Sequence, residues 1–313
     1  MGYSASVVVP TRGGVCRLPR LVEALAGQTR TDFETIFVVD GDIDNSTEYL
    51  EGGGVKNLLP NSSVISFTEN RGRVAALNAG HEVASGDVII RCDDDLDPGS
   101  AYVQNHVSRH QGELSGIIGL TRNILPESSY AKVYGRQADA QAEESALALP
   151  EDLRWRHWAG NVSIPRAIWN EVGPYDSRYR KYGWEDVDYG YRIHQAGYPI
   201  LIAPELTTDH YAASVTTRIR SIRALHSGAA REKFVEIHGA GVLPETIGKG
   251  IWDTSVTALA AISTERSITL MSSVVDSLIQ YVPEPVGRKL VAILVESAGQ
   301  AGVRYPSRAR SSF

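Results

Sequence analysis

The sequence of 313 residues has few cysteines and no excess of basic residues. The two cysteines, Cys16 and Cys92, each lie inside an apolar stretch, so neither a disulfide framework nor a cysteine metal site is indicated. The net charge of −6 argues against a general electrostatic grip on nucleic acid. We therefore expect no nucleic-acid partner.

Signals for membrane insertion and export are also missing. No stretch approaches the roughly 20 consecutive apolar residues that a membrane span needs. The start, MGYSASVVVP, lacks the basic flank and the long apolar core of a signal peptide. These absences predict a cytoplasmic protein, in a reducing compartment and without a membrane span.

The two glycine-rich loops that bind phosphate through backbone amides do not occur either. GxGxxG does not follow the first predicted strand, and GxxxxGK[ST] is found nowhere in the chain. If this protein binds a diphosphate, a metal ion is the expected source of the positive charge.

The first part of the chain alternates short β-branched runs with helix-like stretches, which predicts an α/β fold with a mostly parallel sheet. Strands are expected at 6–10, 35–39, 63–67 and 87–91, and helices at 18–26, 47–51 and 73–84. Ligands of such sheets lie just beyond the carboxyl ends of the strands. Here those ends carry Thr11, Asp40, Asp42 and the acids at 93–95, so the crevice is predicted to be lined with carboxylates.

The later part is expected to be mixed and then helical. A strand is predicted at 116–121, before a polar, alanine-rich stretch at 136–151. Beyond His210, a helix is predicted by the spacing of Met271, Val274, Val275, Leu278, Ile279 and Val282. Pro283 and Pro285 should end it before a second helix at 286–297. The apolar face of 271–282 has two interpretations. One is packing on the core or at a subunit interface, and the other is contact with a membrane surface. The Arg- and Ser-rich tail, 304–313, is expected to be disordered.

Two acids follow the strand expected at 87–91. Because alternate residues of a strand face the same way, Asp93 and Asp95 should project together, and two adjacent carboxylates repel each other. A divalent cation would resolve this repulsion, and oxygen ligands suit Mg²⁺ or Mn²⁺, which usually also bind water and substrate phosphates. A solvated acidic turn is the other interpretation, and Asp97-Pro98-Gly99 favours it.

The surrounding motifs favour the first interpretation. In order, they are VVPTR (8–12), VVDGD (38–42), NRGRVAALNAG (70–80), ASGD (84–87) and DDD (93–95). This succession covers most of residues 5–100 and resembles family 2 glycosyltransferases, which have the GT-A fold. The resemblance implies a Rossmann-like, mostly parallel sheet flanked by helices. Together with the pattern along the chain, it predicts a nucleotide-sugar-binding half at 1–115, an acceptor-binding half at 116–235 and a helical C-terminal appendage at 236–313.

The resemblance also assigns roles at the strand ends. Asp95 is expected to bind Mn²⁺ or Mg²⁺, and Asp93 to contact the ribose or the metal. The nucleotide-binding residues are expected to be Pro10, Thr11, Asp40, Asn70, Asn78, Asp93 and Asp94. Simpler structural roles remain open for several of them, because Thr11 is also a turn residue and Asn70 and Asn78 also suit turns and helix boundaries.

The segment KYGWEDVDYGYR, 181–192, places acids between a glycine and a predicted helix. Capping is one interpretation, because a helix N-terminus favours carboxylates. The stretch also resembles the family's acceptor-side Glu-Asp motif, whose second acid is commonly the base. We predict Asp186 as the catalytic base that takes the acceptor's proton, with Glu185 or Asp188 as alternatives. Trp184 and Glu185 are also expected to face the donor sugar or the acceptor, although a tryptophan is more often core.

Other candidates are Gly160 and Asn161, where small residues of the family let the donor sugar approach the backbone. A lone histidine is usually not a ligand, but by the resemblance His210 completes the metal site with Asp95. Arg218 and Arg220 are candidates for closing over the diphosphate. A solvated helix face is the other interpretation of these arginines.

These features predict an inverting glycosyltransferase that uses a divalent metal and a nucleotide-diphospho-sugar. A UDP-sugar is favoured as donor, dTDP- and GDP-sugars stay open, and the acceptor is not identified. One alternative is a nucleotide-sugar-binding protein without catalysis. Another is a phosphohydrolase whose DxD motif begins with a nucleophile, although that motif normally follows the first strand rather than the fourth. A homo-oligomer through the C-terminal helices is also open.

Overall fold

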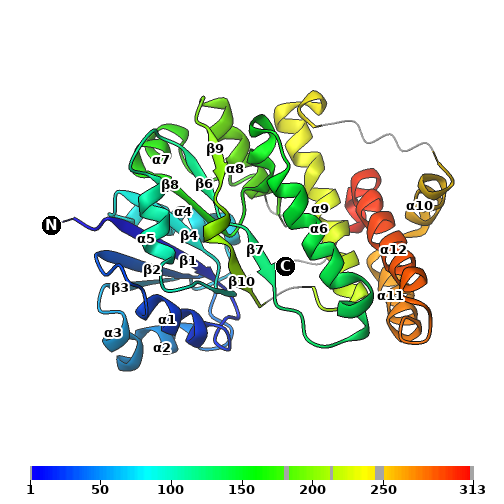
Figure 1. The fold of residues 1–313 in the computed structure, drawn as a ribbon, viewed down its shortest axis with the longest axis horizontal. Helices are drawn as coiled ribbons and strands as arrows, with labels where there is room; N and C mark the ends of the chain where they lie inside the picture. Colours follow the sequence, from blue (N-terminus) through cyan, green and yellow to red (C-terminus); the bar gives the residue numbers. More distant parts are fainter. Residues whose placement is uncertain (1, 180–182, 212–213, 244–249, 311–313) are drawn as a thin grey trace. The chain divides into compact units, whose positions relative to one another are not determined.

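The computed structural model describes residues 2–179, 183–211, 214–243 and 250–310 (Figure 1). The chain forms two compact units. The first contains Met1–Ile124, Glu143–Ser177 and Glu185–Ala212, and the second contains Leu125–Ala142, Arg178–Trp184 and Ala213–Phe313. The functional division expected at 115 and 235 stays a prediction.

The first unit is built on a seven-stranded sheet in the order β3-β2-β1-β4-β8-β6-β9. Strands β3, β2, β1 and β4 are parallel to one another, β8 is antiparallel to β4 and β6, and β6 is parallel to β9. The predicted mostly parallel α/β fold is therefore confirmed. The strands are β1 Ala5–Thr11, β2 Phe33–Val39, β3 Ser62–Ser66, β4 Val88–Cys92, β6 Gly116–Ile118, β8 Asn161–Pro165 and β9 Ile200–Ile202.

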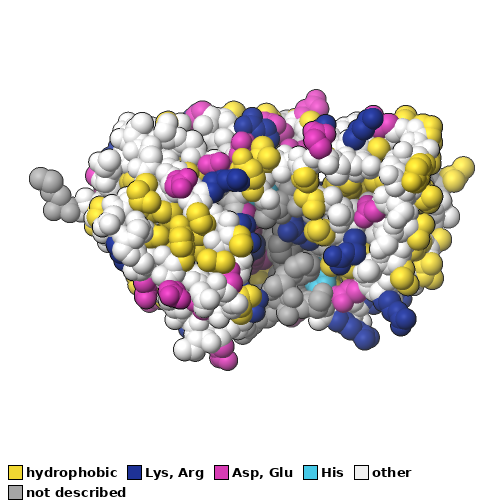
Figure 2. Space-filling model, turned by 90° about the horizontal axis from the view of Figure 1, so that it is seen from below, with side chains coloured by type: hydrophobic (Ala, Val, Ile, Leu, Met, Phe, Trp, Pro, Cys, Tyr) yellow, Lys and Arg dark blue, Asp and Glu magenta, His cyan; other side chains and the backbone are white. Residues whose placement is uncertain are grey.

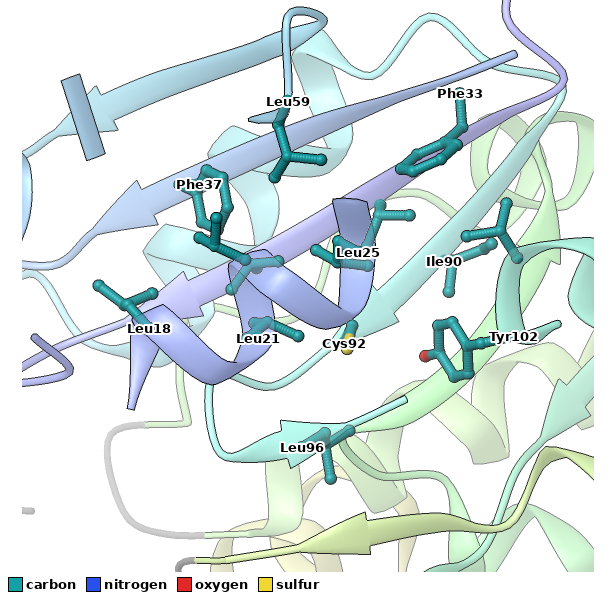
Figure 3. Packing of buried hydrophobic residues seen from close by; sticks show 14 of the residues in the cluster. Leu18, Leu21, Leu25, Phe33, Phe37, Leu59, Ile90, Cys92, Leu96 and Tyr102 are labelled. Atoms are coloured by element: carbon teal, nitrogen blue, oxygen red, sulfur yellow. The ribbon is translucent and has the colours of Figure 1, made fainter. Parts of the chain in front are cut away.

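Helices flank this sheet, and their apolar faces form its core (Figure 3). In α1, Leu18, Leu21 and Leu25 follow helical spacing and pack in one cluster with Phe37 of β2 and Ile90 of β4. Full burial of each such side chain contributes about 1.5–3 kcal/mol. The helices of this unit are α1 Leu18–Ala26, α2 Ser46–Glu51, α3 Gly53–Leu58, α4 Arg73–Val83, α5 Tyr102–Arg109, α7 Arg166–Val172 and α8 Trp184–Gln195, of which Trp184 itself belongs to the second unit.

The prediction of a single strand at 116–121 is wrong. β6 ends at Ile118, and the chain begins a new strand, β7 Thr121–Asn123, in a separate three-stranded sheet. The break falls at Gly119, where a β-carbon would lie 2.7 Å from the carbonyl oxygen of Leu206. The small sheet has the order β5-β10-β7, with β5 at Leu96–Asp97 and β10 at Thr208–His210. It therefore pairs His210 with Leu96, next to the acidic strand end.

The second unit is helical, as expected for the C-terminal region. Its helices are α9 Thr217–His238, α10 Ile251–Ile262, α11 Glu265–Leu278 and α12 Glu284–Arg304, and α6, Arg136–Leu147, begins in this unit and ends in the first. Glycines let α9 and α12 approach closely. A β-carbon on Gly228 would lie 3.0 Å from the backbone nitrogen of Val303, and one on Gly302 would lie 2.8 Å from that of Ala229.

The expectation of a disordered tail is wrong for Tyr305 to Arg310. A short 3₁₀ helix, Pro306–Arg308, lies there, and the Arg308 guanidinium donates to the carbonyl oxygens of Ala260 and Ser263 at 3.1 and 2.9 Å. Carbonyls at the end of a helix have no partner within the helix, so the end of α10 is a natural acceptor for this arginine. Residues 311–313 lie outside the described part of the chain.

The apolar face predicted for 271–282 is only partly buried. Val275 and Ile279 pack in a cluster with α12, whereas Val274 and Leu278 are exposed, as is Leu270 just before this segment. Exposed hydrophobic side chains on this unit are also visible in Figure 2. Whether the exposed part serves an oligomer or another surface stays a prediction. Among the described residues, no helix combines the length and the apolar character that crossing a membrane requires.

Candidate active site

The carboxyl ends of β1, β2 and β4 meet at one edge of the sheet and bring the predicted strand-end residues together. Pro10 is buried in β1, and Thr11 ends that strand. The backbone nitrogen of Asp40 donates to the Thr11 carbonyl at 2.9 Å. Asp93 follows β4, the strand that pairs with β1. This is the edge at which parallel sheets bind ligands.

The Asp40 carboxylate holds the loop before α4. It accepts hydrogen bonds from the backbone nitrogens of Arg71 at 2.6 Å and Gly72 at 2.9 Å, and Asn70 Oδ1 also accepts from Gly72 at 3.0 Å. Gly41, with φ +74°, approaches so closely that a β-carbon would lie 2.7 Å from the Asn70 nitrogen. Asp40 and Asn70 therefore lie together, and their contact with a nucleotide stays a prediction.

Asp94 is bound by Thr11, the last residue of β1, and by Arg17, which precedes α1. Thr11 Oγ1 donates to Asp94 Oδ2 at 2.5 Å, and the Arg17 guanidinium binds both carboxylate oxygens at 2.8 and 3.2 Å. A charged, two-point hydrogen bond of this kind is strong and fixes both partners. The structure thus gives Thr11 and Asp94 a role in holding two strand ends together. Their predicted nucleotide contacts remain untested.

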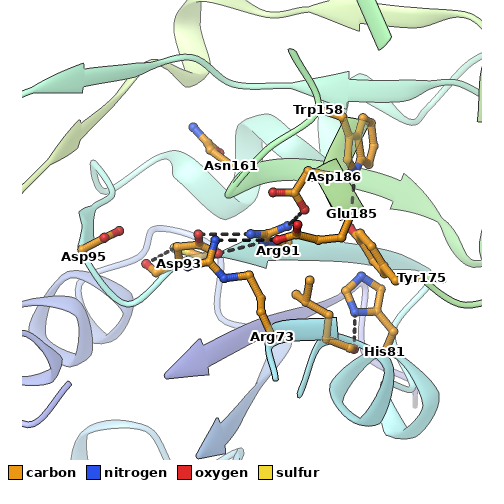
Figure 4. Close-up of polar contacts among 12 residues, drawn as sticks. Arg73, His81, Arg91, Asp93, Asp95, Trp158, Asn161, Tyr175, Glu185 and Asp186 are labelled. Carbon is orange, nitrogen blue, oxygen red and sulfur yellow. Dashed lines mark hydrogen bonds and ion pairs between the residues drawn. The ribbon is translucent and has the colours of Figure 1, made fainter. Parts of the chain in front are cut away.

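Arg91 joins two of the predicted site acids from within β4 (Figure 4). Its side chain is fully buried, and its Nε and Nη2 donate to Asp93 Oδ1 and Oδ2 at 2.8 and 3.1 Å. Its Nη1 donates to Asp186 Oδ1, which α8 supplies. The predicted base and the predicted donor-side acid therefore bind one guanidinium.

The electrostatics of this cluster differ from acid to acid. Burial opposes ionisation of Asp93, but the charges of Arg91 and Arg73 hold its pKa below the usual value. Burial raises the pKa of Asp186, and Arg91 acts in the opposite direction. Burial and the neighbouring Asp186 raise the pKa of Glu185 to about 7, with Arg73 Nη1 at 4.0 Å. A cluster of perturbed acids at a strand edge is typical of functional sites.

Gly160 fits closely against Asp93. Its carbonyl accepts from the backbone nitrogen of Asp93 at 3.0 Å, and a β-carbon on Gly160 would lie 2.6 Å from Asp93 Cγ. Only a residue without a side chain fits beside an Asp93 that Arg91 already holds.

We predict that Gly160→Ala lowers the free energy of unfolding by about 1–3 kcal/mol, because the added methyl group overpacks against Asp93. Displacement of Asp93 should also reduce any activity of the site. Denaturant unfolding and an activity assay measure the two effects. Gly112→Ala is the matched control, because a β-carbon there meets nothing within 4 Å. Equal unfolding curves for Gly160→Ala and the native chain would contradict the prediction.

Two residues that are predicted to contact a ligand, Asn161 and Asn78, form side-chain hydrogen bonds within the protein. The Asn161 amide donates to the Leu206 carbonyl at 2.8 Å and accepts from the Tyr102 hydroxyl at 3.0 Å. The Asn78 amide exchanges hydrogen bonds of 2.9 and 2.8 Å with the backbone of Tyr175. These bonds hold neighbouring segments in place. The ligand-binding roles of both asparagines remain predictions.

Asp95 and His210, the residues that the family resemblance assigns to a metal, lie next to each other. His210 Nε2 lies 3.2 Å from Asp95 Oδ2, and the other carboxylate oxygen of Asp95 is buried without a hydrogen-bond partner. His210 Nδ1 lies 2.7 Å from Asn123 Oδ1, and a ring that donates its hydrogen from Nδ1 to this oxygen has a bare Nε2 that can bind a metal. A bare nitrogen beside a carboxylate fits a cation between them. Among the described residues, no three acids, histidines or cysteines form a complete metal cluster.

The remaining candidates lie in the second unit. Trp184 donates from Nε1 to the Ser227 hydroxyl at 3.2 Å, and its ring centroid lies 5.2 Å from that of Phe234. Arg218 and Arg220 lie in the first turn of α9. Their predicted roles toward the sugar and the diphosphate stay predictions.

Three cations that bind the site acids, Arg17, Arg73 and Arg91, were not predicted from the sequence. A signal for Arg91 was present, because it interrupts an otherwise apolar strand, VIIRC. The carboxylate of Asp188, the alternative base, binds Arg192 at 2.9 Å, one turn along the same helix.

Comparison with known proteins supports both fold and family. A validoxylamine A glucosyltransferase from Streptomyces hygroscopicus subsp. jinggangensis is 29% identical over 229 residues, covering 64% of this chain and 53% of that protein. The mannosyltransferase PcManGT from Pyrobaculum calidifontis, solved with GDP-Man and Mn²⁺, has a TM-score of 0.62 at 16% identity, covering 97% of this chain and 87% of that one. S. aureus TarS 1–349, solved with UDP-GlcNAc, has a TM-score of 0.52 at 15% identity, covering 96% and 92%.

The matches to the first curated relatives span about half of their length. The structural neighbours identify the fold as GT-A. The model of glycosyl transferase family 2 matches residues 6–166, just over half of the chain. The chain therefore belongs to glycosyl transferase family 2.

Proposed function

We propose that this protein is an inverting glycosyltransferase that moves a sugar from a nucleotide-diphospho-sugar to an acceptor nucleophile. The observation that carries the proposal is the meeting of Asp93, at the end of β4, with Asp186, at the start of α8, on the buried guanidinium of Arg91. Such a site offers a donor-side acid and a base within one cluster. Single displacement at an anomeric carbon needs a base for the acceptor and a donor that is held in place on the opposite side.

A divalent cation, Mn²⁺ or Mg²⁺, would be held by Asp95 and His210. With its hydrogen on Nδ1, His210 would supply Nε2 and Asp95 a carboxylate oxygen as two ligands, and such ions usually take the rest from water and substrate phosphates. When bound, the cation would neutralise charge on the leaving diphosphate. The Mn²⁺ in the structure of PcManGT supports this assignment.

Replacing His210 by alanine is expected to weaken Mn²⁺ affinity by about 10-fold or more, because the site loses a metal ligand whose ring is oriented by its contact with Asn123. Isothermal titration with Mn²⁺ in the presence of a nucleoside diphosphate measures the change. His194→Ala serves as the control, since this histidine lies near the end of α8. Superimposable titration curves for His210→Ala and the native protein would remove His210 from the metal site.

Asp186 is the proposed base. It would accept the proton of the acceptor hydroxyl as the acceptor oxygen attacks the anomeric carbon from the face opposite the diphosphate. Burial favours this role, because it raises the pKa of Asp186 and so increases its affinity for the proton. The attack inverts the anomeric configuration.

The donor is proposed to be a UDP-sugar, with GDP- and dTDP-sugars as alternatives. Structural neighbours were solved with GDP-Man and with UDP-GlcNAc, so proteins with this fold bind both kinds of nucleotide. Pro10, Thr11, Asp40 and Asn70 would contact the nucleotide at the edge of the sheet. One relative is named a validoxylamine A glucosyltransferase, so a soluble metabolite is the first acceptor to test.

A donor panel tests the proposal. The protein is incubated with UDP-, GDP- and dTDP-sugars, with Mn²⁺ or Mg²⁺ and small hydroxylated acceptors, and the products are followed by mass spectrometry and NMR. Formation of a nucleoside diphosphate and a glycoside with inverted configuration supports the proposal. Release of inorganic phosphate would identify a phosphohydrolase, and tight donor binding without any product would identify a binding protein.

A further inference from the structure

Arg91 is an unusual residue for the strand that carries it. All five residues of β4 are buried, and the Arg91 side chain is 0% exposed. Buried parallel strands are normally filled by valine, isoleucine and leucine. A buried ion pair rarely stabilises a fold more than apolar residues of similar volume would. The presence of Arg91 therefore points to a role other than stabilising the sheet.

The geometry of Arg91 indicates that role. Alternate residues of β4 face opposite sides of the sheet, and its neighbours Ile90 and Cys92 pack in the apolar cluster that contains α1. Arg91 faces the other side, where its three nitrogens bind Asp93 and Asp186 (Figure 4). A lysine has one compact charge and cannot replace this planar fork.

We infer that Arg91 is a positioning residue that holds the carboxylate of Asp186 at a fixed place relative to Asp93. The inference rests on the proposed function, because it takes Asp186 as the base and Asp93 as the donor-side acid. Gly160 packs against Asp93, and its carbonyl accepts a hydrogen bond from the Asp93 backbone nitrogen, so the position of Asp93 is also fixed by the backbone. Displacing a reacting group by about 1 Å can cost roughly 10²-fold in rate.

The hydrogen bonds also select which oxygen reacts. Asp186 Oδ1 accepts from Arg91, which leaves Oδ2 to take the acceptor's proton. As this proton moves to Oδ2, the acceptor oxygen bonds to the anomeric carbon. The bond from that carbon to the diphosphate breaks, and its electron pair leaves with the nucleoside diphosphate. Arg91 stays charged and bound to Asp93 throughout, so neutralising Asp186 leaves no unpaired cation.

Charged and titratable groups from several elements surround Asp186. Removing Arg91 deletes the nearest positive charge, which favours the protonated acid, so Asp186 would act as a base only at higher pH. The acid limb of a kcat/KM profile should therefore move to higher pH. The groups around Asp186 are Arg73 on α4, Arg91 on β4, Asp93 after it, Tyr175 before α8 and Glu185 on α8.

The test compares Arg91→Lys, Arg91→Gln and the control Arg192→Lys, which alters an ion pair with Asp188 on the same helix. Arg91→Lys is expected to lower kcat by about 10²-fold, with a much smaller change in donor affinity. Arg91→Gln should also move the acid limb of kcat/KM upward by about one pH unit. Arg192→Lys should leave kcat and the acid limb unchanged.

A double variant separates positioning from simple loss of folding. Arg91→Gln combined with Asp186→Asn leaves no charged Asp186 facing the missing guanidinium, and thermal unfolding checks that the protein is folded. If Arg91 acts through Asp186, the double variant loses no more kcat than Asp186→Asn alone. Losses that multiply would overturn the inference.

The inference and the proposed function can fail separately. If the native protein transfers sugar but both Arg91 variants keep its kcat and acid limb, the inference is wrong and the function stands. If the native protein transfers no sugar from any donor, the proposed function is wrong. Carbon-13 NMR titration of Asp186 then decides: a pKa that rises in Arg91→Gln supports the inference, and an unchanged pKa overturns it.

Discussion

Asp186→Asn is expected to lower turnover by about 10²- to 10⁴-fold while donor affinity stays nearly unchanged. The asparagine keeps the size of the side chain and still accepts a hydrogen bond from Arg91, but it cannot take a proton. Because a base acts mainly in the transition state, the loss should fall on kcat. Steady-state kinetics with a saturating donor, together with calorimetry of donor binding, measure the two quantities.

One neighbouring substitution is a control for Asp186→Asn, and another tests the competing base. Asp188→Asn should reduce stability through its Arg192 partner and leave kcat within a few-fold. Glu185→Gln tests the acid whose pKa of about 7 makes it the competing base. The mechanism is wrong if Asp186→Asn turns over at close to the native rate, or if NMR shows that the product keeps the donor's anomeric configuration.

Asp95→Ala is expected to abolish the part of nucleotide-diphosphate binding that depends on Mn²⁺ or Mg²⁺, and with it the activity. The carboxylate has one oxygen beside His210 and a second that is buried without a partner, and without a cation this carboxylate would face the negatively charged diphosphate. Calorimetry of UDP and GDP binding with and without metal measures the loss. EDTA should have the same effect on the native protein.

Asp87→Ala is the matched control for Asp95→Ala, because Asp87 is an exposed acid at the opposite end of β4. It should bind nucleotide and metal like the native protein. Full activity of the native protein in EDTA, or metal-dependent binding that survives in Asp95→Ala, would rule out this metal site.

The central sheet was predictable because its strands are short, apolar and β-branched, as buried parallel strands generally are. The expected strands at 6–10 and 35–39 lie within β1 and β2. The small sheet could not be predicted in the same way. β5, β7 and β10 have two or three residues each and largely polar sequences such as TDH, so they show neither alternation nor an apolar run.

The site was predictable where a motif carries the chemistry and not where distant segments meet. The neighbourhood of Asp95 and His210 followed from the family resemblance. The pairing of Arg91 with Asp186 did not, because it joins residues that only the packing of α8 brings together. The hydrogen bonds of the Asn161 amide with Leu206 and Tyr102 could not be predicted either, because these partners come from other segments.

The three-stranded sheet β5-β10-β7 has a consequence for the order in which the molecule is completed. Asp95 and His210 are far apart in sequence, and His210 reaches its place only when β10 has paired with both β5 and β7. Such non-local pairings pay their loop-closure entropy before they gain contacts, so they form late and slowly. Any metal ion held by these two residues would therefore bind only the folded chain, and its binding would stabilise the folded state against partly folded ones.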